Sequence, residues 1–406
     1  MELVQEKFIE TEIGLIPSDW EVMKLGNMTK LMTNGFVGIA KTHYTENRDG
    51  VLYIQGYNVE ENSFKFKGIK KVTLEFHLNN SKSCLKKDDL LTVQTGDVGL
   101  TTIVPKYLEG SNCHALIITR FKKNRYNALF YCYYLNSKTG RGRLKEIETG
   151  TTMKHINVGE LIHFEVPVPT TVEQTLIASA LSNTDSWITN LENLLTKKRQ
   201  IKQGALQELL KPKKGWEVKK LGDVGECIIG LTYSPDNVTS EGKLVLRSSN
   251  VKDNKLVFSD TVFVNVEVSE KLITRKGDIL ICVRNGSRNL IGKCAYIDGR
   301  GVGETFGAFM SVFRSNYNAY IFQVFQSNII KKQIEEHLGA TINQITNKSL
   351  NSFQIPFPTI KEQEYIVDIL SDMDAEIEQL ETKLEKAKKV KQGMMQELLT
   401  GKTRLV

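Results

Sequence analysis

Aliphatic side chains recur at alternating steps of four and three residues in two separate stretches of the chain, residues 177–209 and 366–398. Such spacing places apolar side chains along one side of a helix, as in the seam of a coiled coil. Pro169 and Pro358 precede the two stretches, where proline can begin a helix but cannot continue one. The pattern predicts two long helices, each of about 38 residues and about 55–60 Å in length.

Both stretches belong to an internal repeat. Residues 150–210 align without a gap on residues 339–399 at a shift of 189 residues, with 26 identities in 61 positions. The segment WEVMKLG at Trp20 also returns as WEVKKLG at Trp216. The chain is therefore a tandem duplication, in which each half has a globular segment, a P-x-P motif and a long helix. The expected segments are a globular domain at 1–168, a central helix at 169–212, a second globular domain at 213–357 and a distal helix at 358–406.

Each long helix carries one apolar stripe and needs a partner, and the duplicate helix of the same chain is the simplest one. Two equal halves pack most simply about a pseudo-twofold axis, which makes the helices antiparallel. The alternative is pairing with another subunit. The side chains expected to pair are Leu181, Ile188, Leu191, Leu195, Leu370, Ile377, Leu380 and Leu384.

Gly204 and Gly393 occupy equivalent positions inside the two predicted helices. Glycine there costs about 1 kcal/mol relative to alanine. Its presence in both copies suggests a close backbone approach, either between the helices or to a partner protein. A tolerated relic of the duplication is the alternative.

The globular segments contain short apolar, β-branched-rich runs bounded by turn residues, which predict strands. In the first half these runs are 51–54, 90–93 and 116–119, and in the second half 244–246, 279–283 and 309–313. Helical segments follow at 127–148 and 318–338. The expected fold class is α+β, with two globular domains separated by two long helices that form an intramolecular antiparallel coiled coil.

Composition narrows the class of protein only a little. The chain of 406 residues is 40% hydrophobic and 25% charged, which excludes a disordered or collagen-like chain. No apolar run reaches the roughly 18 residues of a membrane helix, and the six cysteines contain no C-x-x-C pair that would indicate a zinc site. We expect a cytoplasmic protein without membrane contact. The net charge of +7 and several lysine clusters favour a nucleic-acid partner no more than a solvated surface.

Apparent catalytic motifs do not assemble into an active site. Pro235, Asp236, Glu241 and Lys243 imitate the PD…(D/E)xK pattern of metal-dependent nucleases, but only four residues separate the two carboxylates. Residues 286–293 imitate a phosphate-binding loop with one residue too many. No Pro-Pro dipeptide is present, so the (N/D)-P-P-(Y/F) motif of amino-methyltransferases is missing.

Taken in order, the motifs resemble the specificity subunit of type I restriction–modification systems. The order is I-P-x-x-W-x-x-x-x-L-G, then G-D-[IL]-L, P-x-P-x-x-x-E-Q, a heptad helix and Q-x-L-L. In this chain the pieces are Ile16–Trp20, Gly277–Leu280, Pro356–Gln363 and Leu398–Leu405. Two departures are Asp88-Asp89 in place of Gly-Asp, and Lys213–Gly215 in place of the second Ile-Pro.

The resemblance implies that each globular half is a target-recognition domain for one half of a bipartite double-stranded DNA sequence. The helices would form a spacer that docks methyltransferase (modification) subunits, of which two are expected. Family members carry no catalytic residues and no cofactor; S-adenosylmethionine belongs to the modification subunits, and a restriction subunit cuts DNA. Helices of about 55–60 Å would separate the half-sites by very roughly 10–17 base pairs.

Candidate DNA-contacting residues lie in loops at equivalent places in the two halves, where Arg can pair with guanine and Asn or Gln with adenine. Ordinary turn chemistry is the alternative for each of them. A polar stretch before each long helix, 151–155 and 340–344, is a further candidate. The residues are Gln55, Asn58, Gln94, Thr95, Lys154 and His155 in the first half, and Arg247, Asn250, Arg284, Asn285, Arg288, Asn343 and Gln344 in the second.

Two other functions remain open from the sequence. One is the recognition part of a self-sufficient DNA-modifying enzyme. The other is a coiled-coil adaptor without a DNA role, whose affinity for duplex DNA would not respond to a methyltransferase partner.

Overall fold

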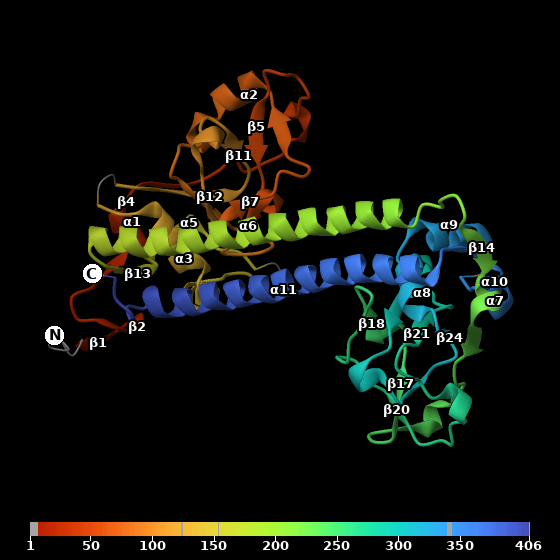
Figure 1. The fold of residues 1–406 in the computed structure, drawn as a ribbon. Helices are drawn as coiled ribbons and strands as arrows, with labels where there is room; N and C mark the ends of the chain where they lie inside the picture. The colour runs from red at the N-terminus through yellow and green to blue at the C-terminus, as the bar shows by residue number, and fades with distance from the viewer. Residues whose placement is uncertain (1–6, 123–124, 153, 339–342, 406) are drawn as a thin grey trace. The chain divides into compact units, whose positions relative to one another are not determined.

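The computed structural model describes residues 7–122, 125–152, 154–338 and 343–405. They form two compact units, the first from the described residues of 1–192 and 383–406 and the second from those of 193–382. Each unit therefore combines one globular domain with a part of each long helix, α6 (Thr171–Leu209) and α11 (Ile360–Leu398) (Figure 1). In the described part of the chain, no helix is both long and apolar enough to cross a lipid bilayer.

The first globular domain is built on two small sheets. Strands of one sheet pair in the order β10 (Thr101–Ile103), β9 (Leu90–Val93), β12 (Leu116–Phe121) and β4 (Thr29–Asn34). The second sheet has the order β11 (Asn112–Cys113), β5 (Val51–Ile54) and β8 (Lys70–Val72). Strand pairs complete it: β1 (Phe8–Thr11) with β2 (Gly14–Pro17), β3 (Glu21–Lys24) with β13 (Glu165–Val168), and β6 (Val59–Glu60) with β7 (Ser63–Phe64).

Helices α1 (Leu25–Met28), α2 (Leu74–Asn79), α3 (Ala128–Asn136), α4 (Lys138–Glu146) and α5 (Val158–His163) belong to the same unit. The helical segment predicted at 127–148 is thus two helices rather than one. Ser137 is extended, and its hydroxyl accepts a hydrogen bond from Gly140 N at 3.0 Å, which caps α4. The predicted strands at 51–54, 90–93 and 116–119 correspond to β5, β9 and β12.

The second globular domain repeats this plan. Its first sheet has the order β15 (Glu226–Ile229), β24 (Met310–Arg314), β21 (Ile279–Cys282) and β22 (Cys294–Tyr296). The second has β16 (Val238–Thr239), β20 (Phe263–Val264), β17 (Lys243–Leu246) and β23 (Thr305–Phe306). The remaining elements are β14 (Glu217–Lys220), β25 (Gln354–Phe357), β18 (Val251–Lys252), β19 (Lys255–Leu256), α7 (Leu221–Val224), α8 (Asn318–Phe325), α9 (Asn328–His337) and α10 (Asn347–Ser352).

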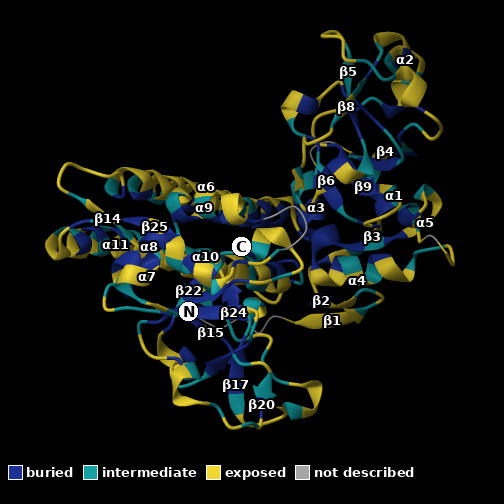
Figure 2. Cartoon of the chain, turned by 90° about the vertical axis from the view of Figure 1, so that its right-hand side faces the viewer, coloured by how far each residue is buried: buried dark blue, intermediate teal, exposed yellow. Residues whose placement is uncertain are grey.

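Here too Ser327 divides the helical segment predicted at 318–338, because its hydroxyl caps α9 through Ile329 N at 3.2 Å. Dark blue strands and helix faces in Figure 2 show that the sheets and the inner faces of the helices form the buried core.

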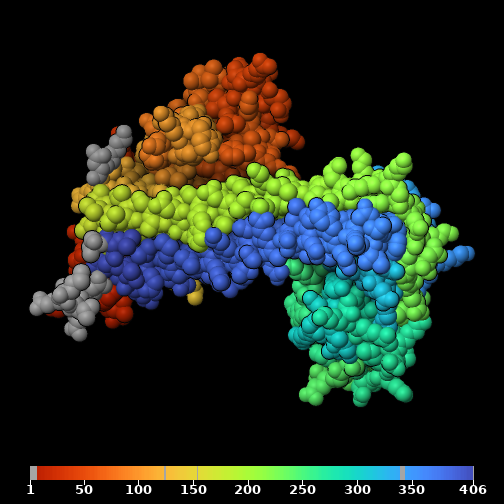
Figure 3. Space-filling model, viewed as in Figure 1, coloured from red at the N-terminus to blue at the C-terminus, as the bar shows by residue number. Residues whose placement is uncertain are grey.

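The two long helices pair antiparallel inside each unit. In the first unit, Ile177 and Leu181 of α6 share a buried cluster with Leu398, the last residue of α11, and with Leu399 directly after it. In the second unit, the cluster joins Leu206 and Leu210 to Ile366 and Leu370. As residue numbers rise on one helix they fall on the other, so the predicted intramolecular antiparallel pairing is present in both units. The space-filling view shows the side chains of the two helices in contact within each unit (Figure 3).

Most of the expected pairing positions are buried. Leu181, Ile188, Leu191, Leu195 and Leu370 lie in the interior, whereas Ile377, Leu380 and Leu384 are half-buried.

The stripe differs from the expectation near one end of each helix. Ile201 and Val390 face solvent, and the neighbouring Lys202 and Lys391 occupy the seam in their place. A straight α-helix drifts about 20° per heptad against a strict seven-residue repeat, which moves the seam to the adjacent residue after several turns.

Neither mid-helix glycine packs against the other helix. A Cβ built on Gly204 or Gly393 would meet nothing within 4 Å. The expected close approach between the helices is therefore wrong. Two explanations remain for the glycines: close contact with a partner protein, or a relic of the duplication.

Several motifs of the repeat have structural roles. Buried Gln174 and Gln363 donate side-chain hydrogen bonds to the carbonyl oxygens of Pro169 and Pro358 at 2.8 and 2.9 Å, which joins each P-x-P motif to its long helix. Thr170 Oγ1 accepts a hydrogen bond from Glu173 N at 3.2 Å and caps α6.

The G-D motif anchors the start of a central strand. Asp89 receives a two-pronged hydrogen bond from Arg120 at 2.7 and 2.6 Å, and Asp278 receives the same from Arg314 at 2.9 and 2.7 Å. The departure from Gly to Asp88 is small, because Asp88 (φ 68°) adopts the left-handed conformation that Gly277 (φ 92°) has in the other half.

Candidate nucleic-acid interface

Three loops that the sequence singled out converge in the second unit. They are residues 247–250 after β17, residues 284–287 after β21 and residues 343–345. Asn285 joins all three: its Nδ2 donates to Ser248 Oγ at 3.1 Å, and its backbone N donates to Asn343 O at 3.3 Å. Ile345 N also donates to Val283 O at 2.8 Å. We call these segments the second loop cluster; residues 340–342 of the predicted polar stretch lie outside the described residues.

Several cluster side chains are exposed and available to a ligand. The guanidinium of Arg284 lies 5.1 Å from the ring centroid of Phe309, and both side chains face solvent. Gln344 and Arg288 are also exposed. Arg247 is half-buried and pairs with Asp260 at 2.8 Å, which holds its guanidinium at the edge of the cluster. The second loop cluster therefore offers arginine and amide groups on a firmly held backbone.

The first unit brings the equivalent loops together with different side chains. Ile156 N donates to Gln94 O at 3.1 Å, and Thr95 forms an antiparallel bridge with His155, as Arg284 does with Gln344. A Cβ on Gly56 would lie 3.6 Å from Val93, so the 55–58 loop packs beside the end of β9. We call residues 55–58, 94–97 and 154–156 the first loop cluster.

Its accessible groups are mainly amide, hydroxyl and phenol. Gln55 Nε2 donates to Tyr57 Oη at 3.2 Å, and Tyr57 Oη donates to Gly68 O at 2.8 Å. Thr95 and Lys154 are exposed, and Lys154 lies 3.8 Å from Glu148. His155 is half-buried and contacts Thr149 Oγ1 at 3.2 Å.

Asn58 and Asn250 do not fit the expected contact with DNA. Their side chains are 1% and 0% exposed. Each Oδ1 accepts a backbone N–H at the start of its own turn, from Gln55 at 3.1 Å and Arg247 at 2.9 Å. Each Nδ2 is bound as well, to Lys65 O at 2.9 Å in the first unit and to Val257 O at 3.0 Å in the second. Both asparagines therefore shape the turn, which was the alternative explanation from the sequence.

Gln94 has a similar bracing role. Its side chain is buried, and its Nε2 donates to Ile156 O at 3.3 Å. It fastens two loops of the first cluster to each other rather than projecting from them.

Sequence reasoning missed an aromatic contact that borders each cluster. In the first unit the rings of Phe66 and Tyr107 lie 6.2 Å apart, and both side chains are exposed. In the second unit Arg300 lies 4.6 Å over the ring of Phe258. The only feature of the sequence that could have indicated the first of these contacts is the aromatic residue Phe66 between Lys65 and Lys67.

The nuclease-like motif does not form a carboxylate pair on adjacent strands. Asp236 lies in a short 3₁₀ turn, Glu241 is in an exposed turn, and Lys243 Nζ donates to Gly303 O at 2.9 Å. Throughout the described residues, no group of three His, Cys, Asp or Glu side chains is placed to hold a metal ion.

Comparison with known proteins agrees with the duplicated architecture. The family model for the type I restriction modification DNA specificity domain matches residues 17–203 and again residues 213–389. The putative type I restriction enzyme MjaX specificity subunit of Methanocaldococcus jannaschii is 26% identical, over 99% of this chain and 97% of its own. The type I restriction enzyme EcoKI specificity subunit of Escherichia coli is 27% identical over 46% of this chain and 42% of its own.

A solved structure shows a related fold. The S subunit of a type I restriction-modification system from M. genitalium superposes with a TM-score of 0.58 at 17% identity, and the match covers 93% of this chain and 96% of that one. A chain from a second structure, of the type I R-M system, gives a TM-score of 0.58 at 15% identity, covering 96% of this chain and 99% of that one.

Proposed function

Because the chain belongs to the type I restriction–modification DNA specificity family, we propose that each of its two units recognises one half of a bipartite DNA target through its own loop cluster. The family makes this chain a non-catalytic specificity subunit that recognises a DNA target. Our proposal adds two points: each unit recognises a different half-site, and modification subunits dock on α6 and α11.

The observation that carries the proposal is that the two loop clusters share one backbone geometry but present different side chains. The bridge Thr95–His155 in one unit corresponds to Arg284–Gln344 in the other. Such a surface can recognise different bases without a change of fold.

The side chains differ in the base edges they can match. Arg284 can donate two hydrogen bonds to the O6 and N7 of guanine, and Gln344 can pair with the N6 and N7 of adenine. Thr95 and Gln55 of the first cluster are neutral and accept as well as donate. The two units are therefore expected to select different half-sites.

Lysines around the clusters suit the phosphate backbone. Lys65 and Lys67 are exposed beside the first cluster, and such contacts supply affinity that is independent of sequence and falls with salt. Base contacts by the clusters would then add the sequence preference.

Exposed apolar side chains on the long helices support the docking of partner subunits there. Trp187, Leu194 and Ile201 of α6 and Val390 of α11 are each about 40–50% exposed, although the helices already have one buried seam. All six cysteines are free thiols, which agrees with an assembly that works on DNA in a reducing cytoplasm.

The decisive experiment is to express the chain with its modification subunits and to map methylated bases by sequencing the genomic DNA. We expect methylation within one sequence made of two short specific parts and an unspecified gap. Exchange of the 213–357 segment for that of another family member should change one part only. Methylation of a continuous sequence, or changes in both parts, would refute the division of labour.

A further inference from the structure

A lysine on the helix seam is tied to the globular domain in the first unit. Lys391 Nζ of α11 lies 2.7 Å from Asp185 Oδ1 of α6 and 3.6 Å from Glu61 Oε1 in the turn between β6 and β7. Tyr133 of α3 donates a hydrogen bond from its hydroxyl to Asp185 at 2.7 Å. One ammonium group thus contacts both helices and a turn of the globular domain.

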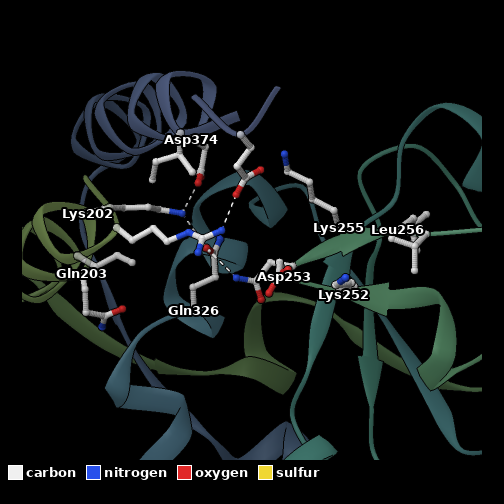
Figure 4. Close-up of a pocket in the computed structure, with 14 residues that line it drawn as sticks. Lys202, Gln203, Lys252, Asp253, Lys255, Leu256, Gln326 and Asp374 are labelled. Carbon is white, nitrogen blue, oxygen red and sulfur yellow. Dashed lines mark hydrogen bonds and ion pairs between the residues drawn. The ribbon is translucent and has the colours of Figure 1, made fainter. Parts of the chain in front are cut away.

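The same arrangement occurs in the second unit with the helices exchanged. Lys202 Nζ of α6 lies 2.5 Å from Asp374 Oδ1 of α11 and donates to Gln326 Oε1 at 2.9 Å. Gln326 Oε1 also accepts a hydrogen bond from Asn254 Nδ2 at 3.3 Å, in the turn between β18 and β19. Figure 4 shows Lys202, Asp374 and Gln326 converging.

The polar link in the second unit bridges an incompletely packed boundary. A cavity of about 460 Å³ lies between the helix pair and the β18–β19 turn, lined among others by Lys202, Asp374, Asn254 and Gln326. Elsewhere in the unit, Leu206 of α6 and Leu370 of α11 pack into the buried core of the domain. At the β18–β19 turn, by contrast, the contacts across the boundary are polar and include the ion pair of Lys255 with Glu378 at 3.1 Å. The position of this turn on the helices therefore depends on polar contacts.

Helix pairing alone does not require these lysines. The side chains of Lys202 and Lys391 are only 11% and 17% exposed. Replacement of a buried ion pair by apolar side chains of similar size is often neutral or stabilising. A lysine kept at the equivalent seam position in both copies, with a domain contact in each, therefore points to a requirement for geometry rather than for stability.

We propose that Lys202 and Lys391 are positioning residues, each holding its own recognition domain in one orientation on the helix pair. The functional part of this inference rests on the proposed recognition of one half-site by each unit. The loop clusters would then be presented at a fixed angle, and loss of either lysine would let one domain sample other orientations without unfolding the chain.

The structural test compares Lys202→Met with Lys198→Met in the full chain. Lys198 lies one turn away on α6 and makes an ion pair with Glu376 at 2.6 Å, on the helices alone. Spin labels at Ser259→Cys and Ser371→Cys, with Cys84 and Cys227 replaced by serine, report the distance between the domain and α11 within the second unit. We expect a clearly broader distance distribution for Lys202→Met and an unchanged one for Lys198→Met. Equal distributions would overturn the proposal whatever the result with DNA.

The functional test measures binding and methylation by the complex with modification subunits. If the binding-competent orientation falls to about a tenth of the population, the apparent affinity falls about tenfold. The Lys202→Met variant should also tolerate targets with altered gaps, and Lys202→Arg should restore the wild-type gap.

The two proposals fail in different ways. A broadened distance with unchanged affinity and gap preference would remove the positioning role in recognition. Failure of the wild-type complex to bind a bipartite target would instead remove the proposed function.

Discussion

Arg404 and Glu173 form an ion pair across 231 residues of sequence, with Arg404 Nε 2.6 Å from Glu173 Oε1. The side chain of Glu173 is 1% exposed and also accepts a hydrogen bond from Trp20 Nε1 at 2.9 Å. Arg404 completes the contact by binding both carboxylate oxygens of Asp19. The segment after α11 is thereby fixed to the start of the first globular domain.

The second unit reaches the same arrangement by chain connectivity. Trp216 Nε1 donates to Glu362 Oε1 at 3.2 Å, and Lys213 lies 5.5 Å over the indole ring. There the backbone itself leads from α6 into β14, whereas in the first unit a guanidinium makes the connection. In the first unit, side-chain contacts of Arg404 therefore make the connection between a long helix and the first strands of the domain that the peptide backbone makes in the second unit.

We expect Arg404→Met to destabilise the first unit by about 3–5 kcal/mol, because a buried carboxylate loses its cation. Chemical unfolding of the full chain, followed by the fluorescence of Trp20 in a Trp187→Phe, Trp216→Phe background, measures the change. The double variant Glu173→Gln, Arg404→Met should recover part of the loss, since no buried charge is left unpaired. A single variant as stable as wild type would show that the ion pair contributes nothing.

The ion pair of Arg404 with Asp19 predicts that stability depends on pH in acid. The hydrogen bond from Arg404 lowers the pKa of Asp19 below its ordinary value of 3.8. A carboxyl whose pKa is lower in the folded state stabilises that state above its unfolded pKa, and the stabilisation disappears as pH falls through the folded pKa. The difference in unfolding free energy between wild type and Asp19→Asn should therefore be constant at neutral pH, begin to decrease near the ordinary pKa of 3.8 and vanish once the pH lies below the lowered pKa of the folded state. A difference that persists at lower pH would assign the effect to packing.

Gly204→Ala and Gly393→Ala should each stabilise the isolated chain by about 0.4–1 kcal/mol. Both glycines lie inside helices with open space where a Cβ would point, and alanine loses less backbone entropy on folding. If modification subunits dock closely there, the same substitutions should weaken the complex in a pull-down titration. Higher stability with unchanged assembly would leave the glycines as relics of the duplication.

The sequence predicted the elements that local pattern determines. The strands at β5 and β9 and the two long helices followed from periodicity, because burial on one face imposes the period. The repeat then predicted which helix each apolar stripe would meet, and contacts such as those of Leu206 with the start of α11 agree.

What the sequence could not predict depends on three-dimensional neighbours. Asn58 and Asn250 stand at equivalent places in the two halves and have the chemistry of base contacts. Both side chains are nevertheless buried and form hydrogen bonds within their own turns. Lys202 stands next to Ile201, and a pattern of apolar residues naturally favours the isoleucine for the seam. The contact of Arg300 with Phe258 joins positions far apart in the chain, so no local sequence pattern could predict it.

Arg284→Ala tests the assignment of the second loop cluster to base recognition. The exposed guanidinium is steadied over Phe309, and a two-pronged contact with guanine accounts for about 1–3 kcal/mol of discrimination. We expect the preference at one base pair of one half-site to relax by that amount, with the other half-site unchanged, in competition binding against single-base variants. Arg275→Ala is the matched control, because Arg275 is an exposed arginine just before β21, whereas Arg284 follows the strand. If the variant instead binds all sequences more weakly by the same factor, and the slope of log affinity against log salt concentration falls by about one, Arg284 contacts a phosphate.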